Sequence, residues 1–266
     1  MLSPAWRQLP VGPLLRGEAD LRHYSDLFLP GCDEVIGAKK ILIKISSRRA
    51  TEEEDCRLAF RDKGRPVLKV FAGEQDRFLN LNDWHELLRS ELRAITRPQW
   101  IQAADQIKNV AIGIHVRMGD FVEPRAETDN PHRRIPHSWF AQSLKAIRSA
   151  VGYPVEAKVV SDGKESELRE LLDQERVTLV RTGSAISDLL VLSNSKVLIA
   201  SAGSSYSAWA AFLGQMPSIA HPSKSFDWFH LRNRNNYYVG GFDPASPVKE
   251  FLDQARLVFK EPPTQS

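Results

Sequence analysis

The 266-residue chain has only two cysteines, Cys32 and Cys56, and they form no CxxC pair. Without closely spaced cysteines the sequence offers neither a disulfide framework nor a cysteine-based zinc site. Such sparse cysteine usage is typical of a reducing compartment. We therefore expect a cytoplasmic protein.

Long apolar runs and an excess of charge are also missing. No apolar stretch reaches the roughly 18 residues that a membrane-spanning helix needs, and no basic stretch followed by an apolar segment opens the chain. The 36 Lys and Arg residues nearly balance the 33 Asp and Glu residues, which leaves a net charge of +3. This balance does not indicate a nucleic-acid partner. We expect a soluble protein without a transmembrane segment, and peripheral association with a membrane stays open.

The common phosphate-binding loops GxxxxGK[ST] and GxGxxG are absent as well. What the second part of the chain does have is a regular alternation of apolar strands and helices. We predict strands at 109–115, 156–160, 177–180, 196–200 and 217–221, with helices at 136–151, 164–174, 187–192 and 203–213. This alternation predicts an α/β fold with a parallel sheet covered by helices on both faces.

The first part of the chain is less regular. We predict strands at 40–45 and 66–71, helices at 51–62 and 82–95, and a linker over 96–107 that contains Pro98. We therefore expect two domains, 1–105 and 106–266.

Polar clusters follow three of the predicted strands. They are His115/Arg117/Asp120, Ser161/Asp162/Gly163 and Gly203/Ser204/Ser205. The carboxyl ends of parallel strands lie on one edge of the sheet, so the three clusters should converge on one cleft.

The residue types in these clusters suit a phosphate ligand. Arg117 can bind two phosphate oxygens at once. The small residues at 200–207 let the backbone approach an anion at the start of a helix, although serine there is also an ordinary helix cap. Asp188 can accept hydrogen bonds from a base such as guanine, or it can simply complement the dipole of its helix.

Four motifs together carry a resemblance to a known superfamily. In sequence order they are His115-x-Arg117-x-Gly119-Asp120-Phe121, Ser161-Asp162-Gly163, Asp188-Leu-Leu-x-Leu-Ser193 and Ser204-Ser205-Tyr206-Ser207-x-Trp209. Their order and spacing resemble the α-1,2/α-1,6/protein O-fucosyltransferase superfamily, and are most similar to bacterial α-1,2-fucosyltransferase-like proteins. The resemblance implies a GT-B-like fold, with two Rossmann-like halves that contain parallel sheets. The superfamily's Gly-rich loop is not found in residues 1–40, so we expect the N-terminal, acceptor-side half to be reduced or truncated.

The resemblance also implies an activity: metal-independent, inverting transfer of fucose from GDP-fucose to a glycan or saccharide acceptor, with no cofactor. It places Arg117, Asp120 and Glu123 in catalysis. It assigns donor binding to His115, Arg117, Asp162, Asp188, Ser204, Ser205 and Tyr206. Met118 stands where the superfamily usually has a second arginine. Two alternatives stay open. Met118, the missing Gly-rich loop and the small N-terminal half leave room for a non-catalytic protein that binds a GDP-sugar, and a transferase that uses another nucleotide sugar is the other alternative.

Overall fold

A six-stranded parallel sheet organises the chain in this computed structural model, which describes residues 26–29, 35, 37–51, 67–70, 77–119, 134–224 and 226–260. The strands are β3 (Ile112–Val116), β4 (Ala157–Ser161), β5 (Val177–Val180), β6 (Val197–Ala200), β7 (Ser218–Ala220) and β8 (Val239–Gly241). Their order across the sheet is β5-β4-β3-β6-β7-β8, and every neighbouring pair is parallel. The predicted α/β class with a parallel sheet is confirmed.

The strand order is that of a Rossmann fold. Starting from β3, the chain builds outward through β4 to β5, and then returns to the other side of β3 with β6, β7 and β8. The direction of winding therefore reverses between β3 and β6. In open α/β sheets this switch point leaves a crevice at the carboxyl ends of the strands, where ligands bind.

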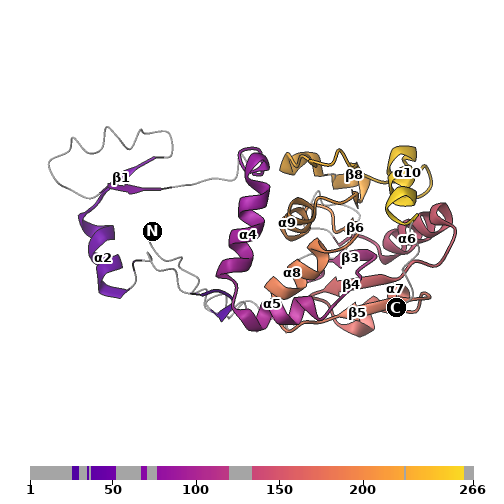
Figure 1. Cartoon of the computed structure of the whole chain (residues 1–266), viewed down its shortest axis with the longest axis horizontal. Coiled ribbons are helices and arrows are strands. Elements are labelled where there is room, and N and C mark those ends of the chain that lie inside the picture. The colour runs from indigo at the N-terminus through magenta and orange to yellow at the C-terminus, as the bar shows by residue number, and fades with distance from the viewer. Residues whose placement is uncertain are drawn as a thin grey trace, which may run out of the picture.

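Helices cover both faces of this sheet (Figure 1). On one face lie α6 (His137–Val151), α7 (Arg169–Leu172) and α10 (Lys249–Val258), with α6 in contact with both of the others. On the other face lie α8 (Ala185–Ser193) and α9 (Ser205–Gly214), which pack against each other. The change of face occurs between β5 and β6, as right-handed crossovers require when the direction of winding reverses.

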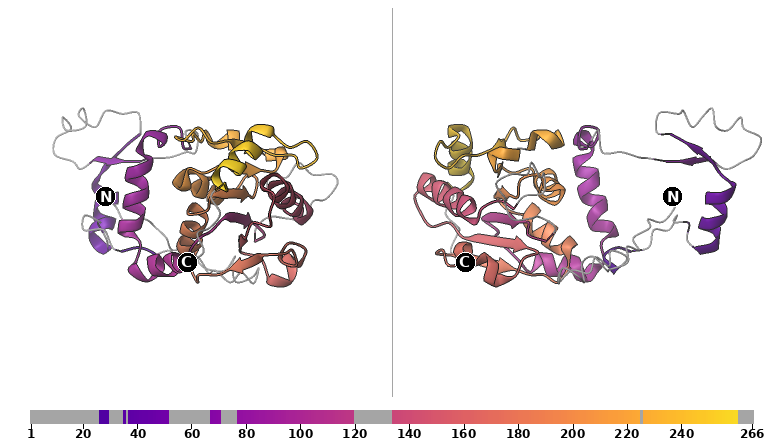
Figure 2. Two further views of the ribbon diagram at one scale, coloured as in Figure 1. Left: turned by 45° about the vertical axis from the view of Figure 1, so that its right-hand side comes forward. Right: turned by 180° about the vertical axis from the view of Figure 1, so that it is seen from behind.

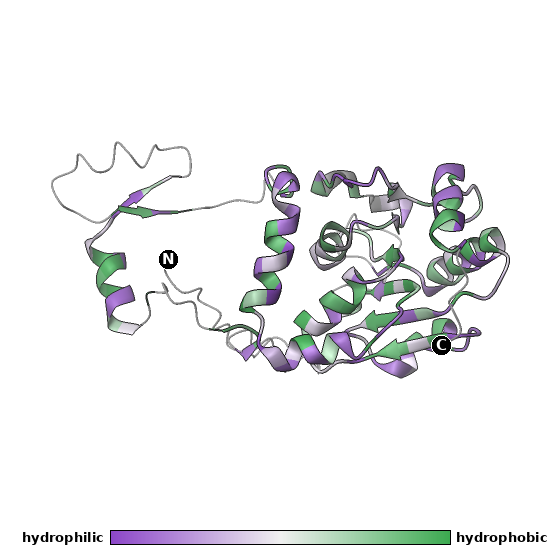
Figure 3. Cartoon of the chain, viewed as in Figure 1, coloured by the Kyte–Doolittle hydropathy of each residue, from purple (hydrophilic) through white to green (hydrophobic). Residues whose placement is uncertain are grey.

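The core lies between these layers. All five residues of β3 and all four of β6 are buried, because a central parallel strand is covered on both sides. Helix α6 contributes Phe140, Leu144 and Ile147, whose spacing places them on one face of the helix. Figure 3 shows the hydrophobic residues concentrated along the central strands.

Two helices that precede β3 form a further layer on the α8/α9 side (Figure 2). They are α4 (His85–Ile95), which contacts α9, and α5 (Pro98–Asp105), which contacts α8. The His85 ring hydrogen bonds through Nε2 to the Leu213 carbonyl at 3.1 Å. The Ser187 hydroxyl donates to the Trp100 carbonyl at 2.7 Å. These contacts attach both helices to the α/β unit.

The remaining described elements are α2 (Gly37–Ser46) and two short parallel strands, β1 (Arg48–Ala50) and β2 (Val67–Lys69). In Figure 1 they lie apart from the six-stranded sheet. Within the described residues, this pair is the only sheet that precedes β3. No helix in the described part of the chain is both long and apolar enough to cross a membrane.

Two sequence predictions are wrong. Residues 40–45 belong to helix α2 rather than to a strand, because Lys40/Lys44 and Ile41/Ile45 repeat at helical spacing and a short apolar run suits either structure. Residues 96–107 contain helix α5 rather than a linker, since Pro98 stands in its first turn, where proline is tolerated.

The other predicted elements agree with the structure or lie outside its described part. The predicted strand at 66–71 is confirmed by β2, and the elements predicted from 109 to 221 are all present within a few residues. The predicted helix at 51–62 falls outside the described residues, apart from position 51. Strand β8 and helix α10 were not predicted.

Candidate active site

The described residues of the three polar clusters lie at the carboxyl edge of the sheet, as the parallel arrangement requires. The register pairs His115 of β3 with Val160 of β4, so the chain beyond both strands leaves the sheet at the same level. Arg117, just past β3, forms an ion pair with Asp162, just past β4. Ser207, near the start of α9, contacts His115. The site is therefore built from the ends of β3, β4 and β6.

One serine bridges the switch point itself. The register of β3 with β6 ends at the pair Ile114 and Ile199. Beyond this pair, the Ser201 hydroxyl donates to the His115 carbonyl at 3.0 Å and accepts from the Arg117 backbone N–H at 2.8 Å. This side chain replaces a ladder hydrogen bond at the point where the strands part, and thereby fixes the backbone on both sides of Arg117.

His115 is a buried, neutral group, with 4% of its surface exposed. Its Nδ1 lies 2.6 Å from the Ser207 hydroxyl, and its ring packs on the Tyr206 ring with centroids 4.9 Å apart. Burial, with the charge of Arg117 as a second cause, lowers the pKa of His115 to about 3. The imidazole therefore stays uncharged at neutral pH and can offer hydrogen bonds, but no positive charge, to a ligand.

Asp162 holds the turn that follows β3. Its carboxylate pairs with the Arg117 guanidinium and accepts hydrogen bonds from two successive backbone N–H groups, those of Met118 at 2.7 Å and Gly119 at 3.1 Å. Both side chains are partly buried, with exposures of 23% for Arg117 and 20% for Asp162. The orientation of Arg117 is therefore set from β4, the neighbouring strand.

Met118 points into the core. It is 4% exposed and belongs to the hydrophobic core of the α/β unit. The backbone of Gly163 approaches it so closely that a Cβ atom there would lie 2.7 Å from the Met118 Cγ. The side chain of Met118 thus packs beneath the turn, and it fits there because Gly163 has no Cβ atom.

The start of α9 supplies backbone donors at the same edge. Gly203 takes the left-handed conformation, with φ of 71°, in the tight turn between β6 and α9. Ser204 caps the helix by accepting a hydrogen bond from the Ser207 N–H at 3.4 Å. Ser205, the first residue of α9, is exposed. Since the first N–H groups of a helix favour an anion, this end of α9 suits a phosphate.

Asp188 and Tyr206 connect α8 to this region. Asp188 accepts hydrogen bonds at Oδ1 from the Thr182 N–H at 3.0 Å and the Thr182 hydroxyl at 2.7 Å. The Tyr206 hydroxyl donates to the Ala185 carbonyl at 2.6 Å. Tyr206 thus joins the ring of His115 to the first turn of α8, where Asp188 also lies.

Two further arginines stand at this edge. The Arg134 Nε donates to the Met118 carbonyl at 3.3 Å, and its guanidinium lies 3.6 Å from the Glu167 carboxylate. Arg181, just past β5, donates to the Gly163 carbonyl at 2.8 Å. Both arginines contact the segments that hold Arg117.

Ser201, Ser207 and Arg181 were not predicted as site residues. Ser201 directly follows an apolar strand, which is the position of the other clusters. Ser207 stands three residues after the capping Ser204, a spacing that returns its side chain to the start of the helix. Each of these serines therefore had a signal in the sequence.

Two predicted catalytic residues, Asp120 and Glu123, lie outside the described residues, because the described range that contains Arg117 ends at Gly119. In the part of the chain that is described, no group of three or more His, Cys, Asp or Glu side chains could hold a metal ion.

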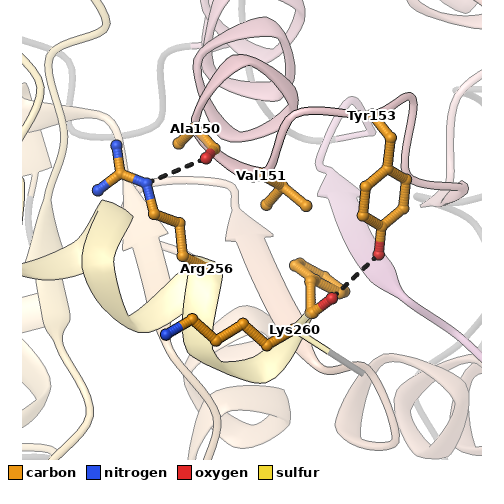
Figure 4. A pocket seen from close by; sticks show the side chains of 6 residues that line it. Ala150, Val151, Tyr153, Arg256 and Lys260 are labelled. Atoms are coloured by element: carbon orange, nitrogen blue, oxygen red, sulfur yellow. Dashed lines mark hydrogen bonds between the residues drawn. The ribbon is translucent and has the colours of Figure 1, made fainter. Parts of the chain in front are cut away.

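A pocket of about 330 Å³ lies beside the final residues of α6 and α10 (Figure 4). It is lined by Ala150, Val151, Tyr153, Arg256, Phe259 and Lys260. The Tyr153 hydroxyl donates to the Phe259 carbonyl at 3.3 Å, and the Arg256 Nε donates to the Ala150 carbonyl at 3.0 Å. Because α6 runs back from the end of β3 to the start of β4, its final residues are remote from Arg117. The pocket is not part of the site described above.

Comparison with solved structures returns proteins of low sequence identity. The chain is similar to NodZ α-1,6-fucosyltransferase soaked with GDP-fucose, with 16% identity, a TM-score of 0.44, and 74% of this chain and 78% of that chain covered. NodZ co-crystallised with GDP gives 16% identity, a TM-score of 0.44, and coverage of 75% and 78%. The wall teichoic acid polymerase TagF gives 10% identity, a TM-score of 0.30, and coverage of 88% and 58%.

The search of curated proteins finds no match. Comparison with protein families, in contrast, finds one that matches more than half of the chain, over residues 67–240. This stretch includes all four motifs that resemble the fucosyltransferase superfamily and every described residue of the site. The chain belongs to glycosyl transferase family 11, and the predicted assignment to the fucosyltransferases is confirmed.

Proposed function

We propose that this protein transfers fucose from GDP-fucose to a saccharide acceptor, with inversion at the anomeric carbon and without a metal ion. The observation that carries the proposal is the position of Arg117. Its backbone N–H lies at the switch point of a Rossmann-like sheet, where it donates to Ser201, and its guanidinium is oriented by Asp162. A nucleoside diphosphate is the kind of ligand that this crevice accepts in such folds.

In this proposal Arg117 binds the β-phosphate and stabilises the departing GDP. The bond between the anomeric carbon and the phosphate oxygen breaks, and its electron pair leaves with GDP. A fixed guanidinium is suited to the negative charge that develops there. Ser204 and Ser205 at the start of α9 add hydrogen-bond donors for the same phosphates.

His115, Tyr206 and Asp188 would form the nucleoside side of the site. The neutral imidazole and the tyrosine ring provide a hydrogen-bonding group and an aromatic surface without charge. Asp188 provides a carboxylate for the N1 and N2 donors of guanine.

The acceptor hydroxyl would attack from the face opposite GDP and give its proton to a carboxylate. We assign this role to Asp120, with Glu123 as the second candidate, because both follow Arg117 closely in the sequence. The N-terminal part, residues 1–105, would complete the acceptor side of a GT-B arrangement with residues 106–266.

Buried Met118 favours a second candidate, a transferase that uses another nucleotide sugar. It provides no charge at the position where the superfamily usually has a second arginine. A preference for UDP over GDP would support this candidate. A protein that binds GDP-fucose without turning it over would instead be a non-catalytic member of the family.

Calorimetric titration with GDP, GDP-fucose and UDP, with magnesium and then with EDTA, tests the proposal. We expect GDP to bind equally with and without magnesium. Arg117→Ala should weaken binding by about 10- to 100-fold, the loss typical of a charged hydrogen-bonding partner. Arg256→Ala, beside the final residues of α6, is the matched control and should bind GDP like the wild type. Undiminished binding to Arg117→Ala would refute the proposal.

A further inference from the structure

Asp162 carries a negative charge at a place where the proposed function needs a positive one. Its carboxylate contacts the Arg117 guanidinium directly, and so cancels part of the charge that would attract a diphosphate. An acidic residue beside a phosphate site lowers the affinity for the ground-state ligand unless it contributes something else. The contacts of Asp162 indicate what that contribution is.

Both carboxylate oxygens face the turn after β3. Oδ1 accepts from the Met118 N–H, and Oδ2 accepts from the Gly119 N–H and from Arg117. Three consecutive residues are thus held by one side chain. Gly163, which follows Asp162 at the end of β4, packs against Met118. The end of β4 therefore fixes the backbone and the guanidinium together.

We infer that Asp162 is a positioning residue, which orients Arg117 for the transition state at the expense of donor affinity in the ground state. This inference rests on the proposed function. It gives Asp162 a role different from the donor contact that the sequence resemblance implies. It also predicts effects of opposite sign: without the carboxylate, GDP binds more tightly but GDP-fucose is cleaved more slowly.

The physical reason is that binding and catalysis make different demands on the guanidinium. A mobile arginine still attracts GDP, and does so more strongly once the neighbouring negative charge of Asp162 has gone. Stabilising a leaving phosphate requires the N–H groups to be aimed in advance, because reorientation during the reaction costs free energy.

Asp162→Asn tests the inference, because asparagine keeps the shape and can still accept one backbone N–H. Glu167→Gln is the matched control. It removes the same charge from the same end of β4, where Glu167 lies near Arg134. GDP affinity is measured by calorimetry, and cleavage is measured as release of GDP from GDP-fucose with water as the acceptor. Thermal unfolding establishes that each variant is folded.

We expect Asp162→Asn to bind GDP about two- to fivefold more tightly, as loss of a partly exposed charge allows, and to release GDP about 10- to 100-fold more slowly. Glu167→Gln should leave the rate unchanged. Asp162→Glu keeps the charge but displaces the oxygens. It should therefore slow cleavage without tightening GDP binding.

Three results would overturn the inference and leave the proposed function intact, provided that the wild type binds GDP. They are weaker GDP binding by Asp162→Asn, an unchanged rate in that variant, and an equal loss of rate in Glu167→Gln. A wild-type protein that binds no GDP would refute the inference and the proposed function together.

Discussion

The hydroxyl of Ser207 lies 2.6 Å from Nδ1 of His115, and this hydrogen bond ties α9 to β3 across the switch point of the sheet. Both residues are buried. The contact therefore joins the two strand ends between which the proposed nucleotide would bind, and it fixes the imidazole beside Tyr206. Its consequences can be tested separately from catalysis.

Ser207→Ala should destabilise the protein by about 1–2 kcal/mol, because the buried His115 nitrogen loses its partner. Chemical denaturation at pH 7.5 measures the loss. Ser193→Ala is the control: its buried hydroxyl donates to the Leu190 carbonyl, which also accepts from the Asn194 N–H. This control should change stability by no more than about 0.5 kcal/mol. Equal effects of the two substitutions would deny the Ser207 contact any special role.

The low pKa of His115 predicts acid sensitivity. The folded protein keeps the imidazole neutral down to a pKa of about 3, whereas in the unfolded chain it takes up a proton near the ordinary histidine pKa of 6.5. Above pH 6.5 neither state is protonated and stability is unaffected. Between pH 6.5 and 3 the unfolded state binds one proton more than the folded state. The free energy of unfolding therefore decreases as the pH is lowered, by up to about 1.4 kcal/mol per pH unit.

His115→Gln isolates this effect. From pH 7.5 to pH 5, the wild type should lose about 2 kcal/mol more unfolding free energy than the variant does. Denaturant titrations at several pH values provide the comparison. Burial also lowers the pKa of His221, but that contribution is present in both proteins and cancels in the difference. Parallel pH profiles for the two proteins would contradict the neutral, buried state of His115.

The sequence was sufficient to predict which residues lie at the strand ends, but it was not sufficient to predict the contacts between them. Arg117, Asp162 and Ser204 could be placed on one edge because parallel strands all point the same way. That Asp162 binds the three residues from 117 to 119 depends on the register of β3 with β4, which no local pattern encodes.

Position 118 illustrates the same limit. In the sequence, Met118 reads as the loss of a charge beside Arg117. In the structure its side chain is part of the core and packs on Gly163. Helix α2 was missed for a related reason, since its apolar run fits a strand as well as a helix until its neighbours are known.

Gly163→Ala should displace Met118 and with it the turn that carries Arg117. The added Cβ would lie 2.7 Å from the Met118 Cγ, and overpacking of this kind typically costs about 1–3 kcal/mol. We expect lower stability together with weaker GDP binding, measured by denaturation and calorimetry.

A second substitution tests the cause. Met118→Ala removes the Cγ atom, so the double variant should recover part of the stability lost in Gly163→Ala. A double-mutant cycle gives the coupling between the two positions. Additive effects would mean that Gly163 acts through something other than its contact with Met118.

Asp188 should determine the preference for guanine. If its carboxylate accepts from both N1 and the 2-amino group, the wild type will bind GDP more tightly than IDP, which lacks that amino group. Asp188→Asn should abolish most of this difference, because an amide offers only one acceptor oxygen. A preference of about tenfold corresponds to one good hydrogen bond to a charged group.

The control must separate base recognition from the local structure that Asp188 also supports. Its Oδ1 accepts from the Thr182 hydroxyl and backbone, so Thr182→Val disturbs the same loop without changing the carboxylate. That variant should bind both nucleotides less well while keeping their ratio. If Asp188→Asn also lowered both affinities by one common factor, Asp188 would be a support of the loop between β5 and α8, and the base would have to be recognised elsewhere.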